Sequence, residues 1–154
     1  MNLVFDLDDT IANSQHRVQK YLWNVDTGER IENPDWDAFF EQCHLDTLLP
    51  AGVLARHHLE SGHDVRIWTA RCASVRNKTV KWLQDNDIWL RHASHLRMRP
   101  INNRIDDDLL KLSWLKEEEK LGFRPDIIFE DRKRLVDMYR DNGYTVFQVD
   151  YGDF

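Results

Sequence analysis

Residues 2–10 read NLVFDLDDT, in which an apolar run of four residues is followed at once by three acids. The apolar run is typical of a buried strand, whereas Asp is depleted in strands and crowded carboxylates repel one another. A divalent cation with oxygen ligands, Mg²⁺ above all, is the simplest partner that would neutralise them. Along an extended chain, Asp6 and Asp8 can face one site while Leu7 points away. The stretch therefore predicts a strand that ends in a cation site.

The acidic stretch has two other interpretations. An acidic turn could cap a following helix, with Asp8 or Asp9 as the N-cap residue. A calcium-binding loop is ruled out, because its glycine is missing and no Glu stands at its closing position. The position of the acids at the end of an apolar strand, with a second acidic strand end later in the chain, favours catalysis.

The composition is that of a globular domain in water. The 154 residues are 42% hydrophobic and 31% charged, which suits a single domain with its own core. No apolar run approaches the roughly 20 residues of a membrane span, and the N-terminus lacks the features of a signal peptide. Cys43 and Cys72 stand in no metal-binding spacing and are expected to be free thiols in the cytoplasm. We expect one domain over residues 1–154 and no membrane partner.

The net charge of the chain is −6. This excess of acidic residues argues against tight binding of a long polyanion, because such binding needs clustered Lys and Arg. It remains compatible with a small phosphorylated substrate or with one nucleic-acid end. Part of the acidity also belongs to the expected cation site, where an ion would cancel it.

Strands and helices alternate from residue 50 onward. Four strands are expected there, over residues 65–69, 95–98, 126–131 and 144–149. Four helices are expected around them, over residues 50–62, 74–86, 106–121 and 132–142. This order predicts an α/β fold with a doubly wound, mostly parallel, Rossmann-like sheet and helices on both faces.

Residues 13–48 form an insert between the first strand and the regular pattern. A short helix is expected over 14–23, and a second with Asn33 and Pro34 as its N-cap and first residue. The side chains expected to face inward from the second helix are Trp36, Phe39, Phe40 and Cys43. The insert is interpreted as a small helical cap over the site, with an aromatic wall for a base or ribose, or else as ordinary packing.

Ligands of parallel α/β sheets bind beyond the carboxyl ends of the strands. Three of the expected strands end in polar residues, namely Asp6-Leu7-Asp8, Thr69-Ala70-Arg71 and Glu130-Asp131. These groups would meet at one edge of the sheet. They are the parts that phosphoryl transfer needs, namely a nucleophile, a cation, donors for the phosphate oxygens and an acid for the leaving group.

The carboxylates divide among these roles. Asp6 is the candidate nucleophile, which attacks phosphorus in line to give an aspartyl-phosphate. Asp8 is the candidate general acid, and then the base that activates water. Asp6 and Asp131 are expected to hold Mg²⁺ together with the backbone carbonyl of Asp8, and Glu130 to join directly or through water.

The phosphate donors come from other parts of the chain. Thr69 offers a hydroxyl group to a phosphate oxygen, and Lys111, early in its helix, is preferred over Lys116 as the fixed positive charge. Further substrate contacts are expected from Thr10, Ala70 and Arg71.

This combination resembles the haloacid dehalogenase-like phosphatase superfamily. The pattern Asp-x-Asp-x-Thr, a Thr that closes the second strand, a Lys on a helix and an acidic pair that closes the fourth strand occur here in that order. A narrower resemblance covers nearly the whole chain. The segments NPDWDAFF (33–40), IWTARCASVR (67–76), LRMRPINNRIDDDLLK (96–111) and IIFEDRKRLVDMYRDNGYTVFQVDYGDF (127–154) are similar to the 3′-phosphatase half of phage polynucleotide kinase-phosphatases and their stand-alone relatives.

The resemblance implies Mg²⁺-dependent removal of a 3′-phosphate from DNA or RNA ends or from nucleotides. It also implies that the substrate is surrounded by Arg71, Arg76, Arg99 and Arg104, and, for a phage-encoded protein, that the compartment is the host cytoplasm. The chain departs from the pattern at Glu130-Asp131, where many relatives have two Asp. No G-x-x-x-x-G-K-S/T loop occurs, so no 5′-kinase activity is expected.

Three alternatives remain beside this function. The acidic net charge favours a phosphatase of free nucleoside monophosphates. A phosphomutase is a weaker alternative, because it usually needs a larger cap to exclude water. A non-catalytic phage binding module on the same scaffold is opposed by the presence of every expected catalytic side chain. The oligomeric state is left open.

Overall fold

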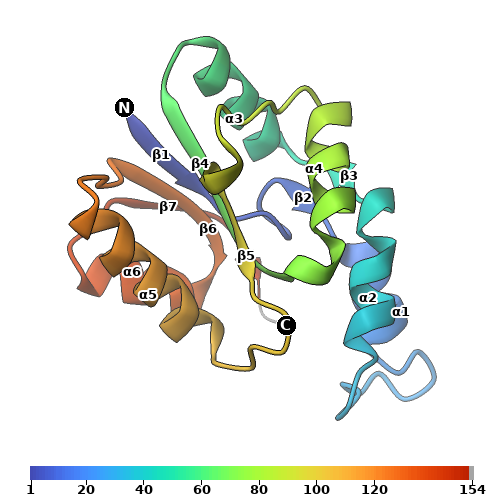
Figure 1. Ribbon diagram of the computed structural model, residues 1–154. Coiled ribbons are helices and arrows are strands. Elements are labelled where there is room, and N and C mark those ends of the chain that lie inside the picture. The colour runs from blue at the N-terminus through green and yellow to red at the C-terminus, as the bar shows by residue number, and fades with distance from the viewer. Residues whose placement is uncertain (153–154) are drawn as a thin grey trace.

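A five-stranded parallel sheet forms the centre of the computed structural model, which describes residues 1–152 (Figure 1). Its strand order is β5-β4-β1-β6-β7, and every neighbouring pair runs parallel. The strands are β1 (Asn2–Phe5), β4 (Asp64–Cys72), β5 (Leu96–Arg99), β6 (Ile127–Arg132) and β7 (Val146–Gly152). Asp153 and Phe154, which close the resemblance noted above, lie outside the described residues.

Helices cover both faces of this sheet. On one face lie α3 (Pro50–Glu60) and α4 (Arg76–Asp85), and on the other α5 (Asp107–Lys120) and α6 (Lys133–Asp141), as Figure 1 shows. Successive residues of β1 point to opposite faces, so Phe5 joins the core under α3 and α4 while Val4 joins the core under α5 and α6. The predicted doubly wound parallel α/β fold is confirmed.

Element boundaries differ from the prediction by a few residues. Strand β4 continues past Thr69 to Cys72, and a 3-10 turn, η2 (Ala73–Val75), precedes α4. Strand β7 begins two residues later than expected and runs on to Gly152. These shifts arise at strand ends, where pairing with a neighbouring strand rather than local propensity sets the boundary.

The insert after β1 folds as a separate small unit. It contains α1 (Gln15–Tyr21), α2 (Trp36–Glu41) and a 3-10 helix, η1 (Gln42–Leu45). Two short antiparallel strands, β2 (Ala12–Asn13) and β3 (Thr47–Leu48), pair at its base. In Figure 1, α1 and α2 lie beyond the sheet, next to one end of α4.

The second helix of the insert begins later than predicted. Asp35, not Asn33, is its N-cap residue, and its carboxylate accepts a hydrogen bond of 2.9 Å from the amide of Ala38. The shift places Trp36 in the first turn, where its side chain is 42% exposed rather than inward. Phe39 is buried as expected and packs against the apolar face of α1.

None of the helices within residues 1–152 combines the length and the apolar character that crossing a membrane requires.

Candidate active site

Three carboxylates meet where β1 and β6 end. One oxygen atom from each of Asp6, Glu130 and Asp131 can be chosen so that all three lie within 4.8 Å of one another, and all three residues are buried. The neighbouring strands β1 and β6 are in register at Phe5 and Phe129, and the amide of Asp6 donates to the carbonyl of Phe129 over 2.9 Å. The sheet itself therefore brings Asp6, which follows β1, together with the two acids in the last part of β6.

Lys111 extends from the first part of α5 into this group. Its Nζ atom lies 2.5 Å from Oδ1 of Asp6 and 2.8 Å from Oε2 of Glu130, and its side chain is buried. Burial by itself would lower the pKa of Lys111, but Asp6 and Glu130 raise it well above its usual value. Lys116 lies farther along α5, where its side chain is 53% exposed and pairs with Glu119.

Within residues 1–152, Asp6, Glu130 and Asp131 face the ammonium group of Lys111 and the positive charge of Arg132. Burial, reinforced by Glu130, raises the pKa of Asp6 to about 7, although Lys111 opposes the shift. Burial also raises the pKa of Asp131 to about 9, with further contributions from Asp6 and Glu130. Both shifts arise first because burial disfavours the charged form, and the neighbouring carboxylates add to this, although Arg132 opposes the shift of Asp131.

Asp131 carries the clearest sign of a missing partner. Its Oδ1 atom accepts a hydrogen bond of 3.3 Å from the hydroxyl group of Thr10. Its Oδ2 atom is buried and has no hydrogen-bond partner among the described residues. Clustered carboxylate oxygens are the ligands that Mg²⁺ prefers. The residues present therefore fit a magnesium ion.

Asp8 lies among different neighbours from Asp6. Leu7 between them is fully buried in the apolar core. The carboxylate of Asp8 accepts hydrogen bonds from the guanidinium groups of Arg71, 2.5 Å away, and of Arg17. Burial would raise the pKa of Asp8, but Arg17 and Arg71 hold it well below its usual range. Different neighbours thus shift the pKa values of these two carboxylates in opposite directions.

Asp46 joins these two arginines from the end of the insert. It accepts from Nη2 of Arg17 over 2.8 Å and from Nη2 of Arg71 over 3.0 Å, and both partners are fully buried. The guanidinium group of Arg17 also lies 4.4 Å from the centre of the Phe39 ring. The buried group of Asp8, Arg17, Asp46 and Arg71, called the arginine cluster below, ties the insert to the end of β4.

Sequence reasoning identified neither Arg17 nor Asp46 as a site residue. Arg17 had a usable signal, because it precedes Tyr21 by four residues and so puts a charge on the face of α1 that was expected to be apolar. Asp46 had none, since it follows a 3-10 helix in a segment without a periodic pattern.

The predicted phosphate donors at the end of β4 lie close to the arginine cluster. Thr69 is buried, and its hydroxyl oxygen accepts from the amide of Arg71 over 3.1 Å. The carbonyl of Ala70 accepts from Nε of Arg99 over 3.2 Å, which brings the end of β5 to the same edge.

Two predicted arginines do not join this group. Arg76 donates to the carbonyls of Ala93 and Leu96 at the start of β5. Arg104 is exposed in the loop before α5 and has no ion-pair partner in the part of the chain that the structure describes.

Asp107 is a further polar residue that the sequence did not single out. It is the first residue of α5, one turn before Lys111, and its carboxylate accepts from the guanidinium groups of both Arg99 and Arg132. These contacts fasten the start of α5 between the ends of β5 and β6. They therefore fix the place from which Lys111 reaches Asp6.

The capping interpretation of the acidic stretch is wrong, because Ser14, and neither Asp8 nor Asp9, is the N-cap residue of α1. The backbone of Asp9 adopts a positive φ of 59°. Its carboxylate accepts from the amide of Ser14 and from the side-chain amide of Gln15, each over 2.8 Å. Asp9 thus organises the turn into α1 and is not one of the clustered acids.

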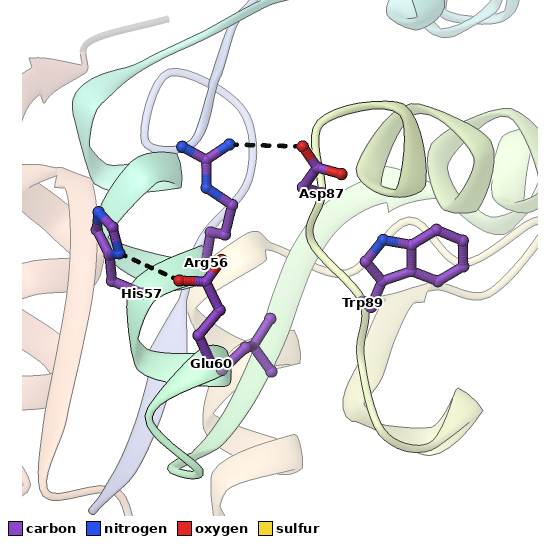
Figure 2. Close-up of a pocket in the computed structure, with 6 residues that line it drawn as sticks. Arg56, His57, Glu60, Asp87 and Trp89 are labelled. Atoms are coloured by element: carbon purple, nitrogen blue, oxygen red, sulfur yellow. Dashed lines mark hydrogen bonds and ion pairs between the residues drawn. The ribbon is translucent and has the colours of Figure 1, made fainter.

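A surface hollow elsewhere is lined by Arg56, His57, Leu59, Glu60, Asp87 and Trp89 (Figure 2). It lies between the last turn of α3 and the segment after α4. Both segments lead into the beginnings of strands, at Asp64 and Leu96. The hollow is therefore at the amino edge of the sheet, opposite the carboxylates.

Comparison with known proteins gives one family match. The family model described as the polynucleotide kinase PNKP phosphatase domain matches residues 1–154. No curated protein matches the sequence at a significant level.

Solved structures share the fold. A chain of the Pnkp1/Rnl/Hen1 RNA repair complex superposes with a TM-score of 0.75 at 24% identity, over 99% of this chain and 43% of that one. The class C acid phosphatase from Bacillus anthracis gives 0.63 at 15% identity, over 98% and 67%. A haloacid dehalogenase-like hydrolase from Streptococcus pneumoniae gives 0.60 at 14%, over 99% and 85%. This chain spans less than half the length of the chain from the RNA repair complex.

Proposed function

This chain belongs to the family of polynucleotide kinase PNKP phosphatase domains, and from that premise we propose that it removes the 3′-phosphate from DNA or RNA ends or from nucleotides, with the help of Mg²⁺. Membership makes it a phosphatase, a phosphoric monoester hydrolase. The observation that carries the proposal is the meeting of Asp6, Glu130 and Asp131 around Lys111 at the carboxyl edge of the sheet.

In the proposed reaction, Asp6 attacks phosphorus and the bond to the 3′-oxygen of the substrate breaks. Asp8 gives its proton to that oxygen as it leaves. Asp8 then takes a proton from a water molecule, which attacks the aspartyl-phosphate, so that inorganic phosphate departs and the Asp6 carboxylate is restored. The ammonium group of Lys111 and the hydroxyl group of Thr69 stabilise the phosphoryl oxygens.

The contacts of the arginine cluster indicate that Asp8 takes up its proton only after the phosphate binds. Without substrate, Arg17 and Arg71 keep Asp8 ionised, a state that cannot donate a proton. An incoming phosphate is a better partner for a guanidinium group than one carboxylate, because it offers more oxygen acceptors. Phosphate binding beside Arg71 would weaken the hold on Asp8 and let it take up the proton that it later donates.

Asp6, Asp131 and the backbone carbonyl of Asp8 would hold Mg²⁺, and Glu130 would join directly or through water. When bound, the ion supplies positive charge that offsets the negative charge on the phosphoryl oxygens. The Oδ2 atom of Asp131, which is buried and has no hydrogen-bond partner within residues 1–152, supports this assignment. Besides its contact with Lys111, Glu130 accepts a second hydrogen bond at its Oε1 atom, from the backbone amide of Asp131 over 3.2 Å.

Polynucleotide ends are the preferred substrate class because of the family membership. The solved chain with the highest identity reported above is part of an RNA repair complex, which motivates testing RNA ends alongside DNA ends. Arg99 and the exposed Arg104 are the proposed contacts for the polynucleotide. Free nucleoside monophosphates are the second candidate, favoured by the net charge of −6.

The test compares phosphate release from 3′-phosphorylated DNA and RNA oligonucleotides with release from nucleoside monophosphates at equal concentration. Faster release from the oligonucleotides is expected, and the reverse order would make the chain a nucleotidase. In Asp6→Asn the shape of the side chain is kept but the nucleophile is lost, so release should fall by about 10³-fold or more. Undiminished release by that variant in excess Mg²⁺ would exclude the aspartyl-phosphate mechanism. Absence of release by the unaltered protein from every phosphate tested would favour the binding module.

A further inference from the structure

The end of β7 leaves the regular sheet pattern beside Asp131. Strands β6 and β7 pair in step as far as Glu130 opposite Gln148, and the next pair is Arg132 opposite Gly152. Three residues of β7 therefore stand opposite the single residue Asp131. Such bulges bend a strand and are frequent next to active sites. Here the bulge carries the last described residues of β7 across the carboxyl end of β6.

The bulged end holds Asp131 from two directions. The side-chain amide of Gln148 donates to the carbonyl of Asp131 over 3.1 Å. On the other side, the backbone of Gly152 lies directly against the carboxylate. A Cβ atom built on Gly152 would be 1.6 Å from Oδ2 and 2.6 Å from Cγ of Asp131, distances that non-bonded atoms do not reach. In this arrangement only glycine fits at position 152.

We infer that Gly152 is a positioning residue that keeps the Asp131 carboxylate directed at Asp6 and Glu130, and that the bulged end of β7 forms one wall of the cation site. The inference rests on the proposed metal site and adds to it a residue far from the sequence motifs. Oδ1 of Asp131 is held by Thr10, whereas Oδ2, which lacks a hydrogen-bond partner among the described residues, is the atom next to Gly152.

The physical reason lies in how little room the carboxylate has. Asp131 is buried, so a side chain at position 152 could be accommodated only if the carboxylate rotated or the end of β7 moved away. Rotation would change how the carboxylate is directed toward Asp6 and Glu130. Movement of β7 would open the wall to water. Either response weakens cation binding while the core of the sheet stays intact, because position 152 lies at the end of an edge strand.

The experiment measures Mn²⁺ binding to the full chain by titration calorimetry, and the rise in melting temperature on adding Mg²⁺. Gly152→Ala should bind Mn²⁺ at least about tenfold more weakly, which is the size of effect seen when a group that orients a metal ligand is lost. Tyr151→Ala is the matched control, since this neighbouring side chain in the bulge is 86% exposed. Its affinity should stay within about twofold of the unaltered protein.

Gln148→Ala provides a second, milder variant. It removes the hydrogen bond from the Gln148 side chain to the Asp131 carbonyl and introduces no steric clash. Its affinity should fall between those of the unaltered protein and Gly152→Ala. Equal affinity of Gly152→Ala and the unaltered protein would overturn the inference and leave the metal site standing. If the unaltered protein binds no Mn²⁺, or if Asp131→Asn binds it equally well, the proposed metal site fails and this inference with it. Circular dichroism shows that each variant is folded at the temperature of the titration.

Discussion

The Nζ atom of Lys111 lies 2.5 Å from Oδ1 of Asp6, although 105 positions separate the two residues in the chain. The contact joins the end of the central strand to the first part of α5. It places a fixed positive charge next to the proposed nucleophile, and Glu130 shares that charge over 2.8 Å. The pair is buried, so either partner left alone would be an uncompensated charge away from water.

Replacement of Lys111 by Met tests the importance of that charge. Loss of the ammonium group removes the lysine that pairs with Asp6 and Glu130, and with it a donor for the phosphoryl oxygens. We expect phosphate release to fall by about 10²–10³-fold, the range found when one donor to a developing negative charge is deleted. Lys116→Met on the exposed side of the same helix is the control and should change the rate little. Equal rates for both variants would remove Lys111 from the site.

The arginine cluster predicts a large dependence of stability on Asp46. In Asp46→Ala the guanidinium groups of Arg17 and Arg71 lose a shared, fully buried partner. Breaking a buried ion pair by removing one partner typically costs about 3–5 kcal/mol in the free energy of unfolding. Urea unfolding of Asp46→Ala, Arg17→Ala and the double variant measures the coupling between the two residues.

His16 provides a matched control for that experiment. Its Nε2 atom lies 2.9 Å from the same Asp46 carboxylate, but its side chain is 40% exposed. His16→Ala should therefore change the free energy of unfolding by no more than about 1 kcal/mol, the typical size for exposed pairs. A loss as small as this in Asp46→Ala would mean that the cluster does not hold the insert to the sheet.

The raised pKa of Asp131 predicts how the stability of the metal-free protein depends on pH. The folded chain keeps a proton on Asp131 up to about pH 9, while the unfolded chain releases it near the usual value of 3.8. The folded state therefore binds more protons, and stability must fall as the pH rises toward about 9. Asp6, with a pKa of about 7, contributes in the same direction at lower pH. Burial lowers the pKa of His58 and His95, which oppose the trend only around their usual value of 6.5.

Thermal melting between pH 7 and pH 9.5 in EDTA checks this prediction. We expect the melting temperature to fall across this range, and the fall to be smaller in Asp131→Asn, which carries no titrating carboxyl group there. Added Mg²⁺ should raise the melting temperature most at high pH, where the carboxylates are ionised. A flat profile in EDTA would contradict the proposed crowding of charge.

Removal of the metal gives the most direct test of cofactor use. EDTA should abolish phosphate release, and excess Mg²⁺ should restore it. Asp131→Asn should require a higher Mg²⁺ concentration for half-maximal release, because one anionic ligand becomes neutral. Full turnover in the presence of chelator would exclude the role given to Asp131.

Much of the fold could be predicted because its signals are local. Alternation of apolar segments with helical periodicity gave the order of elements, and glycine marked the helix ends at Gly62, Gly122 and Gly143, all of which have positive φ. The start of α2 was mispredicted, because Asn33-Pro34 and Asp35 offer competing caps two residues apart. In the structure the carboxylate of Asp35 takes the capping hydrogen bond, and Phe39 of the resulting helix packs against α1.

The sequence by itself determined the sheet and the acids at its carboxyl edge, because strand ends are encoded by the residues that adjoin them. It also indicated Lys111, whose place near the start of a helix could be read from the same pattern. Only the tertiary structure decided which charges pair. Asp8 accepts hydrogen bonds from Arg17 and Arg71. Asp46 shares the arginine Arg71, and Asp6 pairs with Lys111. Those partnerships join segments up to 105 positions apart, and burial makes each charge depend on the partner that folding brings to it.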